Sequence, residues 1–228
     1  MYRYETHLHT YPVSRCAKRT VRENLEYYKG LGYDGVFVTN HFLDGNINIE
    51  RDRPFAEKLD FYCSDYEQAK LLSEEIGIRV FFGVEMSYKG TDFLVYGLHK
   101  AWYAAHPEII GMERSAILSL LKENGALVVQ AHPYREANYI DHIRLFPRHV
   151  HGIEIVNASR PDFENDMAAY YAQSYGLIPF AGSDNHRAEG QPHLAGVQFE
   201  TPIRDEADFV ARVLAREAEI FRLTPGTV

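Results

Sequence analysis

Five short, largely apolar runs of this chain each end in an imidazole or carboxylate side chain. These runs are residues 4–9, 36–41, 80–85, 127–132 and 178–186, and they end in His9, His41, Glu85, His132 and His186. Short apolar runs rich in β-branched and aromatic residues are typical of buried β-strands. Imidazoles and carboxylates are ligands of divalent transition metals. The pattern therefore predicts a fold in which several strand ends meet around a site for more than one metal ion.

Helical patterns separate most of these runs. A capping box formed by Thr20 and Glu23 predicts a helix that ends at Gly32. Further helices are expected over residues 60–76, 115–124, 163–175 and 206–218, and strands over residues 4–9, 35–39, 79–84, 93–96, 126–131, 152–156 and 177–181. Strands that alternate with helices favour parallel pairing with right-handed crossovers. About seven such units predict one domain over residues 1–228, a distorted (β/α)7 TIM-like barrel with its site at the C-terminal ends of the strands.

Composition narrows the class of protein. Hydrophobic residues make up 46% of the 228 residues, enough for one buried core, and the net charge of −8 argues against a surface that coats nucleic acid. The two cysteines, Cys16 and Cys63, are too few for a disulfide framework. The N-terminal residues do not resemble a signal peptide, and no apolar run approaches the roughly 20 residues of a membrane span. We expect a cytoplasmic protein that does not bind membranes, and the sequence gives no strong sign of nucleic-acid binding; its oligomeric state stays open.

The spacing of the polar residues favours metal binding over an ordinary polar core. His7 and His9 are two residues apart, so on a strand both side chains point to the same face. Asp184 and His186 repeat this spacing near the other end of the chain. One such pair alone could line a core and be satisfied by hydrogen bonds. Two pairs at strand ends make that alternative weaker.

One carboxylate, Glu85, occupies the same position in the pattern as the histidines. A carboxylate at the end of an apolar strand must be paired, protonated or metal-bound, because burying it alone is costly. It can also bridge two ions. His99 follows the fourth expected strand and is either a ligand or a polar loop residue. The other histidines lie in helical or loop contexts and are not expected to be ligands: His106, His142, His149, His151 and His193.

Five ordered motifs resemble those of the PHP (polymerase and histidinol phosphatase) family. They are His7-Leu8-His9-Thr10, Thr39-Asn40-His41, Gly83-Val84-Glu85, Ala131-His132-Pro133 and Gly182-Ser183-Asp184-Asn185-His186. They follow the family's order and cover nearly the whole chain. The resemblance implies a distorted seven-stranded barrel that binds two to three divalent ions (zinc, manganese or iron) and hydrolyses phosphate esters.

The resemblance also implies a ligand set for each ion. The first ion would be held by His7, His9, Glu85 and Asp184, the second by Glu85, His99 and His132, and the third by His41 and His186. Of these residues, four are also expected to act in catalysis: Glu85, His132, Asp184 and His186.

Two departures from the family's motifs concern the third ion. The family often has an Asp or His between the first motif and the first helix, where residues 11–16 of this chain offer no strong hard ligand. Asn40 stands where the second motif usually has Asp. The third ion would then bind weakly, recruit water or use Cys16, although single buried cysteines are usually inert.

These features favour a phosphoesterase, histidinol-phosphatase-like, that acts on a small phosphorylated metabolite or nucleotide. Divalent ions lower the pKa of bound water and make hydroxide available for attack on phosphorus. Arg15, Arg135 and Arg187 follow ligand motifs and are candidates to bind the phosphate group, although each could be an ordinary solvated cation. The segments 42–59, expected to be a loop, and 188–193 would shape the pocket.

Two other functions stay open from the sequence. The fold could be a metal-stabilised binding or regulatory module without turnover. It could also hydrolyse a bond other than a phosphate ester, such as an amide, because the same metal chemistry attacks carbonyl groups. Neither the residues nor the resemblance specifies the substrate.

Overall fold

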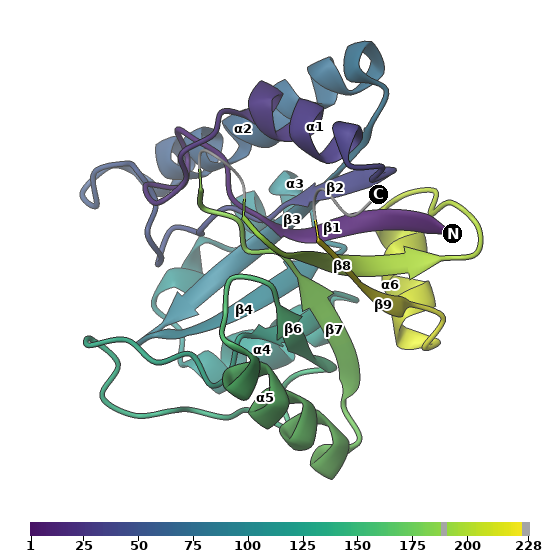
Figure 1. Ribbon diagram of the computed structural model, residues 1–228. Helices are drawn as coiled ribbons and strands as arrows, with labels where there is room; N and C mark the ends of the chain where they lie inside the picture. The colour runs from purple at the N-terminus through teal and green to yellow at the C-terminus, as the bar shows by residue number, and fades with distance from the viewer. Residues whose placement is uncertain (188–190, 225–228) are drawn as a thin grey trace.

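One mixed sheet organises the computed structural model, which describes residues 1–187 and 191–224 (Figure 1). Within these residues the sheet has nine strands in the order β7-β6-β5-β4-β3-β2-β1-β8-β9. The strands are β1 (Tyr2–Leu8), β2 (Gly35–Val38), β3 (Arg79–Tyr88), β4 (Thr91–Tyr96), β5 (Leu127–Ala131), β6 (Gly152–Asn157), β7 (Ile178–Gly182), β8 (Leu194–Phe199) and β9 (Glu219–Leu223). The helices are α1 (Val21–Gly30), α2 (Phe55–Ile76), α3 (Lys100–Ala105), the 3-10 helix η1 (Pro107–Ile110), α4 (Arg114–Glu123), α5 (Asp162–Tyr175) and α6 (Glu206–Leu214).

The sheet nearly closes into a barrel because its two parallel parts meet at β1 and β7. Strands β1, β2 and β3 are parallel to one another, and so are β5, β6 and β7. The amide of Asp184 donates to the carbonyl of His7 (2.9 Å), and the Thr6 hydroxyl donates to the carbonyl of Ala181. This arrangement confirms the expected α/β, barrel-like fold. It also brings the first and last polar motifs of the chain together.

Strand β4 interrupts the parallel arrangement. It is antiparallel to both of its neighbours, β3 and β5. A two-residue turn, Lys89-Gly90, joins it to β3, and the φ angles of 50° and 82° in this turn suit a tight hairpin. The expectation that helices separate the strands throughout is wrong at this point. The count of seven βα units is accordingly not confirmed.

Most element boundaries lie within a few residues of those expected. The capping box of α1 is confirmed, because the Thr20 side chain accepts the amide of Glu23 and the Glu23 side chain accepts the amide of Thr20. Helix α2 begins at Phe55, inside the expected loop, directly after Pro54. The last helix ends at Leu214 rather than at residue 218, because a turn with a positive φ of 61° at Arg216 separates it from β9. Strands β8 and β9 and helix α3 were not expected, and none of the described helices is long and apolar enough to cross a membrane.

Apolar side chains close one end of the barrel. Phe209 of α6 packs against the rings of Phe37, Tyr96 and Phe180, and all four side chains are fully buried. Tyr96 is the last residue of β4 and pairs with Leu127, the first residue of β5. The aromatic group therefore lies where the parallel strands begin. The polar motifs lie at the opposite end, where those strands finish.

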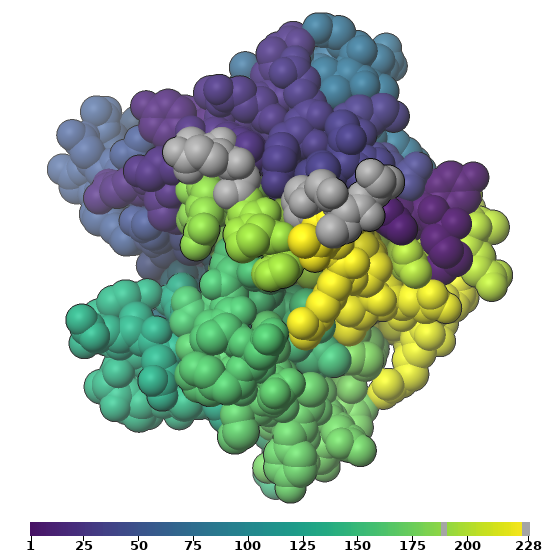
Figure 2. All heavy atoms as spheres, viewed as in Figure 1, coloured from purple at the N-terminus to yellow at the C-terminus, as the bar shows by residue number. Residues whose placement is uncertain are grey.

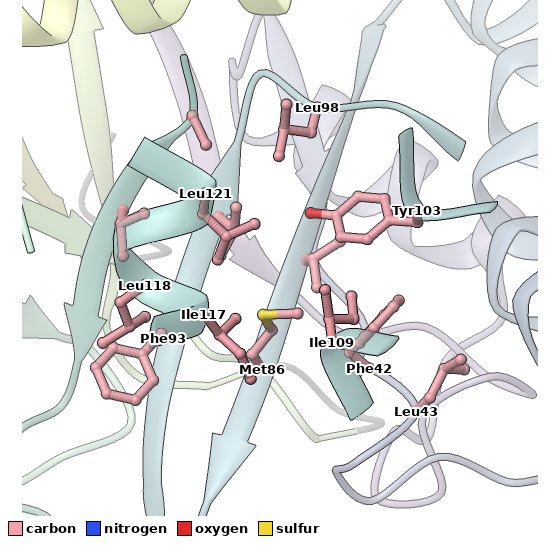
Figure 3. Close-up of a cluster of buried hydrophobic side chains, with 14 of the residues drawn as sticks. Phe42, Leu43, Met86, Phe93, Leu98, Tyr103, Ile109, Ile117, Leu118 and Leu121 are labelled. Atoms are coloured by element: carbon pink, nitrogen blue, oxygen red, sulfur yellow. The ribbon is translucent and has the colours of Figure 1, made fainter. Parts of the chain in front are cut away.

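A second apolar layer packs helices onto the outer face of β3 and β4. Figure 3 shows Met86 of β3 and Phe93 of β4 beside the buried side chains of α4, which are Ile117, Leu118 and Leu121. Side chains alternate between the two faces of a strand. Because Met86 faces the outer layer, its neighbour Glu85 faces the interior of the barrel.

The close crossing of β1 and β8 generates a stability prediction. A Cβ atom on Gly196 of β8 would overlap the backbone carbonyl oxygen of Tyr4 in β1, whereas a Cβ on Gly30 of α1 would meet nothing within 4 Å. We expect Gly196→Ala to lower the free energy of unfolding by about 1–3 kcal/mol, as overpacking does. Gly30→Ala is the control and should leave it unchanged or raise it. Urea denaturation measures both, and equal midpoints for the two variants would contradict this account of the contact between β1 and β8.

Candidate metal centre

The polar motifs meet around the side chain of Glu85, at the carboxyl end of the parallel strands. Its Oε1 lies 3.1 Å from His7 Nε2 and 3.5 Å from His132 Nε2. Its Oε2 lies 3.3 Å from His9 Nε2 and 2.6 Å from His41 Nδ1. Four imidazoles, from the ends of β1, β2 and β5, therefore surround one carboxylate. Glu85 itself lies within β3, which continues to Tyr88.

Asp184 adds a second carboxylate from the end of β7. Its Oδ1 lies 3.3 Å from His9 Nε2, 3.5 Å from His7 Nε2 and 3.3 Å from His186 Nδ1. The backbone φ of Asp184 is 50°, and that of His132 is 23°. Such angles are uncommon for residues other than glycine, and strained backbone of this kind is concentrated at functional sites.

Several buried atoms at this centre have no hydrogen-bond partner among the described residues. They include His9 Nε2, Asp92 Oδ2 and Asp184 Oδ1. Buried polar atoms are normally paired, and lone pairs that converge without a donor are suited to a cation. Three sets of donor atoms lie within 4.8 Å of one another: His7, His9 and Asp184; His7, Glu85 and His132; and His9, Cys16, His41 and His186. The residues present therefore fit divalent metal ions.

Hydrogen bonds behind the imidazoles fix which ring nitrogen faces the centre. His7 Nδ1 lies 2.9 Å from the Glu154 carboxylate, and His9 Nδ1 lies 3.0 Å from the Ser14 hydroxyl. The Ser14 hydroxyl donates to Asn40 Oδ1 (2.7 Å), so its oxygen accepts from His9. With Nδ1–H donating outward, Nε2 of both rings faces the carboxylates and offers a lone pair to a cation once the ring is neutral. Asn40 thus orients His9 through Ser14, which gives a structural role to one departure from the family's motifs.

Opposite charges shift the pKa values at the centre in opposite directions. Burial raises the pKa of Glu85, but the nearby imidazoles, with His41 foremost, outweigh burial and hold that pKa well below its ordinary value. Burial lowers the pKa of His7, but the carboxylates of Asp184 and Glu154 outweigh it and raise that pKa well above the ordinary value. Metal ligands must be deprotonated, so bound cations would replace the protons held here.

The sequence did not identify two carboxylates at this site. Glu154 of β6 is fully buried and accepts the amide of His132 (3.0 Å) as well as facing His7. The sequence contained a signal for Glu154, because it is a charged residue inside an otherwise apolar strand, as Glu85 is. Asp92, at the start of β4, lies 3.8 Å from His132 Nε2 and 3.4 Å from the guanidinium of Arg135. Asp92 lies near His132 because β4 is antiparallel to its neighbours, and the sequence alone does not show this direction.

The structure does not bring His99 to the centre. It is exposed and follows the last strand residues of β4. Because β4 runs antiparallel to its neighbours, its C-terminal end lies at the end of the barrel away from Glu85. The expectation that His99 completes the second ligand set does not fit this position. The other expected ligands do lie together: His7, His9, His41, Glu85, His132, Asp184 and His186.

A cavity of about 540 Å³ opens beside the centre. Cys16, His41, His186, Asp92 and Arg135 are among the residues that line it. In Figure 1 the loops over residues 42–54 and 133–145 extend past the strand ends on the left. In Figure 2 they border an indentation of the surface. The expected role of segment 42–59 in shaping the pocket is supported, because Asp44, Gly45, Asn46 and Arg51 line the cavity.

Among the described residues, Arg135 is the single expected phosphate-binding arginine that lines the cavity. Arg15 and Arg187 are exposed and do not line it. Two cations that the sequence did not single out, Arg51 and Lys89, do line it. Of the expected pocket segment 188–193, residues 188–190 lie outside the described residues.

Comparisons with known proteins connect this fold to the PHP family. A family model described as PHP-associated (PHP_C) matches residues 162–218. A two-domain protein from Bacteroides vulgatus with a domain described as a PHP-like metal-dependent phosphoesterase matches with a TM-score of 0.68 at 13% identity, over 96% of this chain and 64% of that protein. This chain therefore spans less than two thirds of that relative. No curated protein matches the sequence.

Two further solved structures cover almost the same length as this chain. A protein from Bifidobacterium adolescentis, described as a metal-dependent phosphoesterase, matches with a TM-score of 0.56 at 15% identity, over 95% of this chain and 96% of its own. An amidohydrolase from Chromobacterium violaceum with bound sulfate matches with a TM-score of 0.54 at 15% identity, over 99% of both chains. At these identities the likeness shows the fold. The family model adds a likeness to a PHP-associated segment over residues 162–218.

The hydrogen bonds of Glu154 generate a prediction for metal affinity. Glu154→Gln removes the charge that orients His7, and outer partners of this kind typically contribute about 10–100-fold to metal affinity. We expect a loss of that size, measured by titrating zinc against a chromophoric chelator. Glu206→Gln is the matched control, because Glu206 is also buried but accepts the amide of Phe82 instead (2.8 Å). Equal affinities for the two variants would remove the orienting role of Glu154.

Proposed function

We propose that this PHP-like chain is a metal-dependent hydrolase that cleaves phosphate esters of small molecules. The observation that carries the proposal is the buried carboxylate of Glu85 among four imidazoles, next to an open cavity. Two of the structural neighbours are described as phosphoesterases, which supports the choice of phosphate esters over other substrates.

The proposed ligand sets follow the positions of the side chains. The first ion would be held by His7, His9, Glu85 and Asp184, the second by Glu85, His132 and Asp92, and the third by a set that includes His41 and His186. Asp92 takes the place that the sequence had given to His99. When bound, such ions supply hydroxide near neutral pH and neutralise charge on phosphoryl oxygens.

Other side chains near the cavity would bind the phosphate group, transfer a proton and orient the ligands. Arg135 is held beside Asp92 (3.4 Å), and its guanidinium can grip a phosphate group with two donors. His41 and His186 line the same cavity, and when the third position holds no ion either could deliver a proton to the leaving oxygen. Glu154 and Ser14 keep His7 and His9 in the tautomer that ligation requires.

The central test compares the metal-free protein with reloaded protein. After chelation, we expect no phosphate release from a panel of phosphomonoesters and phosphodiesters. After reloading with zinc, manganese or iron(II), we expect turnover of at least one ester class. Asp184→Asn should lower that turnover by about 100-fold or more, because it removes a charged ligand and so weakens binding of the first ion. Steady-state phosphate release provides the measurement.

The same panel separates the competing functions. Amides and lactones are included because the same centre could act on a carbonyl group, as the likeness to an amidohydrolase fold allows. Fully reloaded protein that hydrolyses only these compounds would replace the proposed substrate class. Reloaded protein that hydrolyses nothing, yet gains thermal stability from its metal, would point to a binding module.

A second prediction distinguishes Asp92 from His99. Asp92 Oδ2 is buried, has no hydrogen-bond partner among the described residues and lies 3.8 Å from His132 and 3.4 Å from Arg135, whereas His99 is exposed at the other end of β4. We expect Asp92→Asn to weaken one ion position by about 10-fold or more and His99→Asn to leave ion content unchanged. Elemental analysis after gel filtration reports both. Loss of an ion in His99→Asn with full content in Asp92→Asn would reverse the assignment.

A further inference from the structure

We propose that Cys16 supplies a sulfur ligand to the third ion position, so that this position selects a thiophilic ion such as zinc over manganese. The inference rests on the proposed function, since it concerns one of the ions of the same centre. It goes further because it assigns a ligand of different chemical class to one position. The three positions would then differ in the metals that they prefer.

The geometry supports a shared site. The donor atoms of His9, Cys16, His41 and His186 all lie within 4.8 Å of one another. They come from four separate segments of the chain, which follow β1, β2 and β7 or lie in the turn before α1. His9 Nε2 points into this group, is buried and has no hydrogen-bond partner among the described residues. The cysteine is therefore one member of a convergent set.

The position of Cys16 is fixed by the turn that carries it. Within this turn the amide of Ser14 donates to Thr10 (3.0 Å) and the amide of Ala17 donates to Ser14 (3.1 Å). The amide of Arg15 donates to Asn46 (3.0 Å) in the neighbouring loop. Cys16 is partly buried and lines the cavity, so its sulfur is accessible to an ion entering from solvent.

The donor types distinguish this position from the other two. His9 also lies 3.3 Å from both Glu85 and Asp184, so it can serve the first ion instead. Cys16, His41 and His186 then leave one sulfur and two nitrogen donors with an open position, a set typical of catalytic zinc. The first and second positions include carboxylate oxygens, which suit manganese as well. Sulfur is a soft donor and disfavours manganese.

Cobalt(II) provides a direct test, because a cobalt–thiolate bond gives a charge-transfer band in the near ultraviolet. The chain has two cysteines, and Cys63 is buried within α2. We expect the band in the cobalt-loaded natural chain and in Cys63→Ala, where Cys16 is the sole remaining thiol. Cys16→Ser should lack it. Absence of the band from fully loaded Cys63→Ala would overturn the inference even if Cys16→Ser failed to fold.

Competition between metals gives the second measurement. Metal-free protein is dialysed against equal concentrations of zinc and manganese, and bound ions are counted by mass spectrometry. We expect Cys16→Asp, which supplies a hard oxygen donor, to raise the ratio of manganese to zinc by about tenfold or more at one position. An unchanged ratio would overturn the selectivity. A cobalt–thiolate band in protein that hydrolyses no phosphate ester would support this inference and overturn only the proposed function.

Discussion

The buried charge of Glu85 is the constraint on which the rest of the site depends. Its side chain is 1% exposed and lies within 3.5 Å of four imidazoles. An isolated carboxylate in such a place would cost several kcal/mol, so it persists only with compensating positive charge. Nearby carboxylates raise the pKa values of His7 and His41, so protons on these two rings provide that charge in the metal-free chain. Divalent ions would provide it in the loaded chain. The convergence of so many ligands on one carboxylate has this electrostatic cause.

The barrel holds that charge in place by separating an apolar end from a polar one. The aromatic group around Phe209 fills the end where the parallel strands begin, and the helices pack against the outer face of β3. Because side chains alternate between the two faces of a strand, Glu85 then faces the interior of the barrel. The closure between β1 and β7 adds Asp184 to His7 and His9 from the opposite end of the chain. The arrangement of the side chains at the polar end of the barrel therefore depends on the apolar packing at the opposite end.

The local sequence pattern was sufficient to identify the candidate ligands on strands that are parallel to their neighbours. His7, Glu85, His132 and Asp184 each follow or end an apolar run, and the carboxyl ends of parallel strands meet at one edge. The same reasoning failed at β4, because it assumed that β4 is parallel to its neighbours. The direction of a strand follows only from its pairing with other strands, and β4 is antiparallel to both β3 and β5. The reasoning therefore selected His99 at the end of the strand and passed over Asp92 at its beginning. Strands β8 and β9 carry none of the candidate ligands that marked the other strands, and the sequence reasoning placed no element over either of them.

The sequence by itself determined the chemical nature of the site. Imidazoles and carboxylates at successive strand ends specify a centre for metal ions, whatever the details of the barrel, because burial leaves such groups few other partners. Tertiary structure decided which further side chains lie at this centre. Asp92, Glu154 and Cys16 lie there because of strand direction, side-chain alternation and the path of one turn. Those properties depend on contacts between distant segments, which no local run of residues encodes.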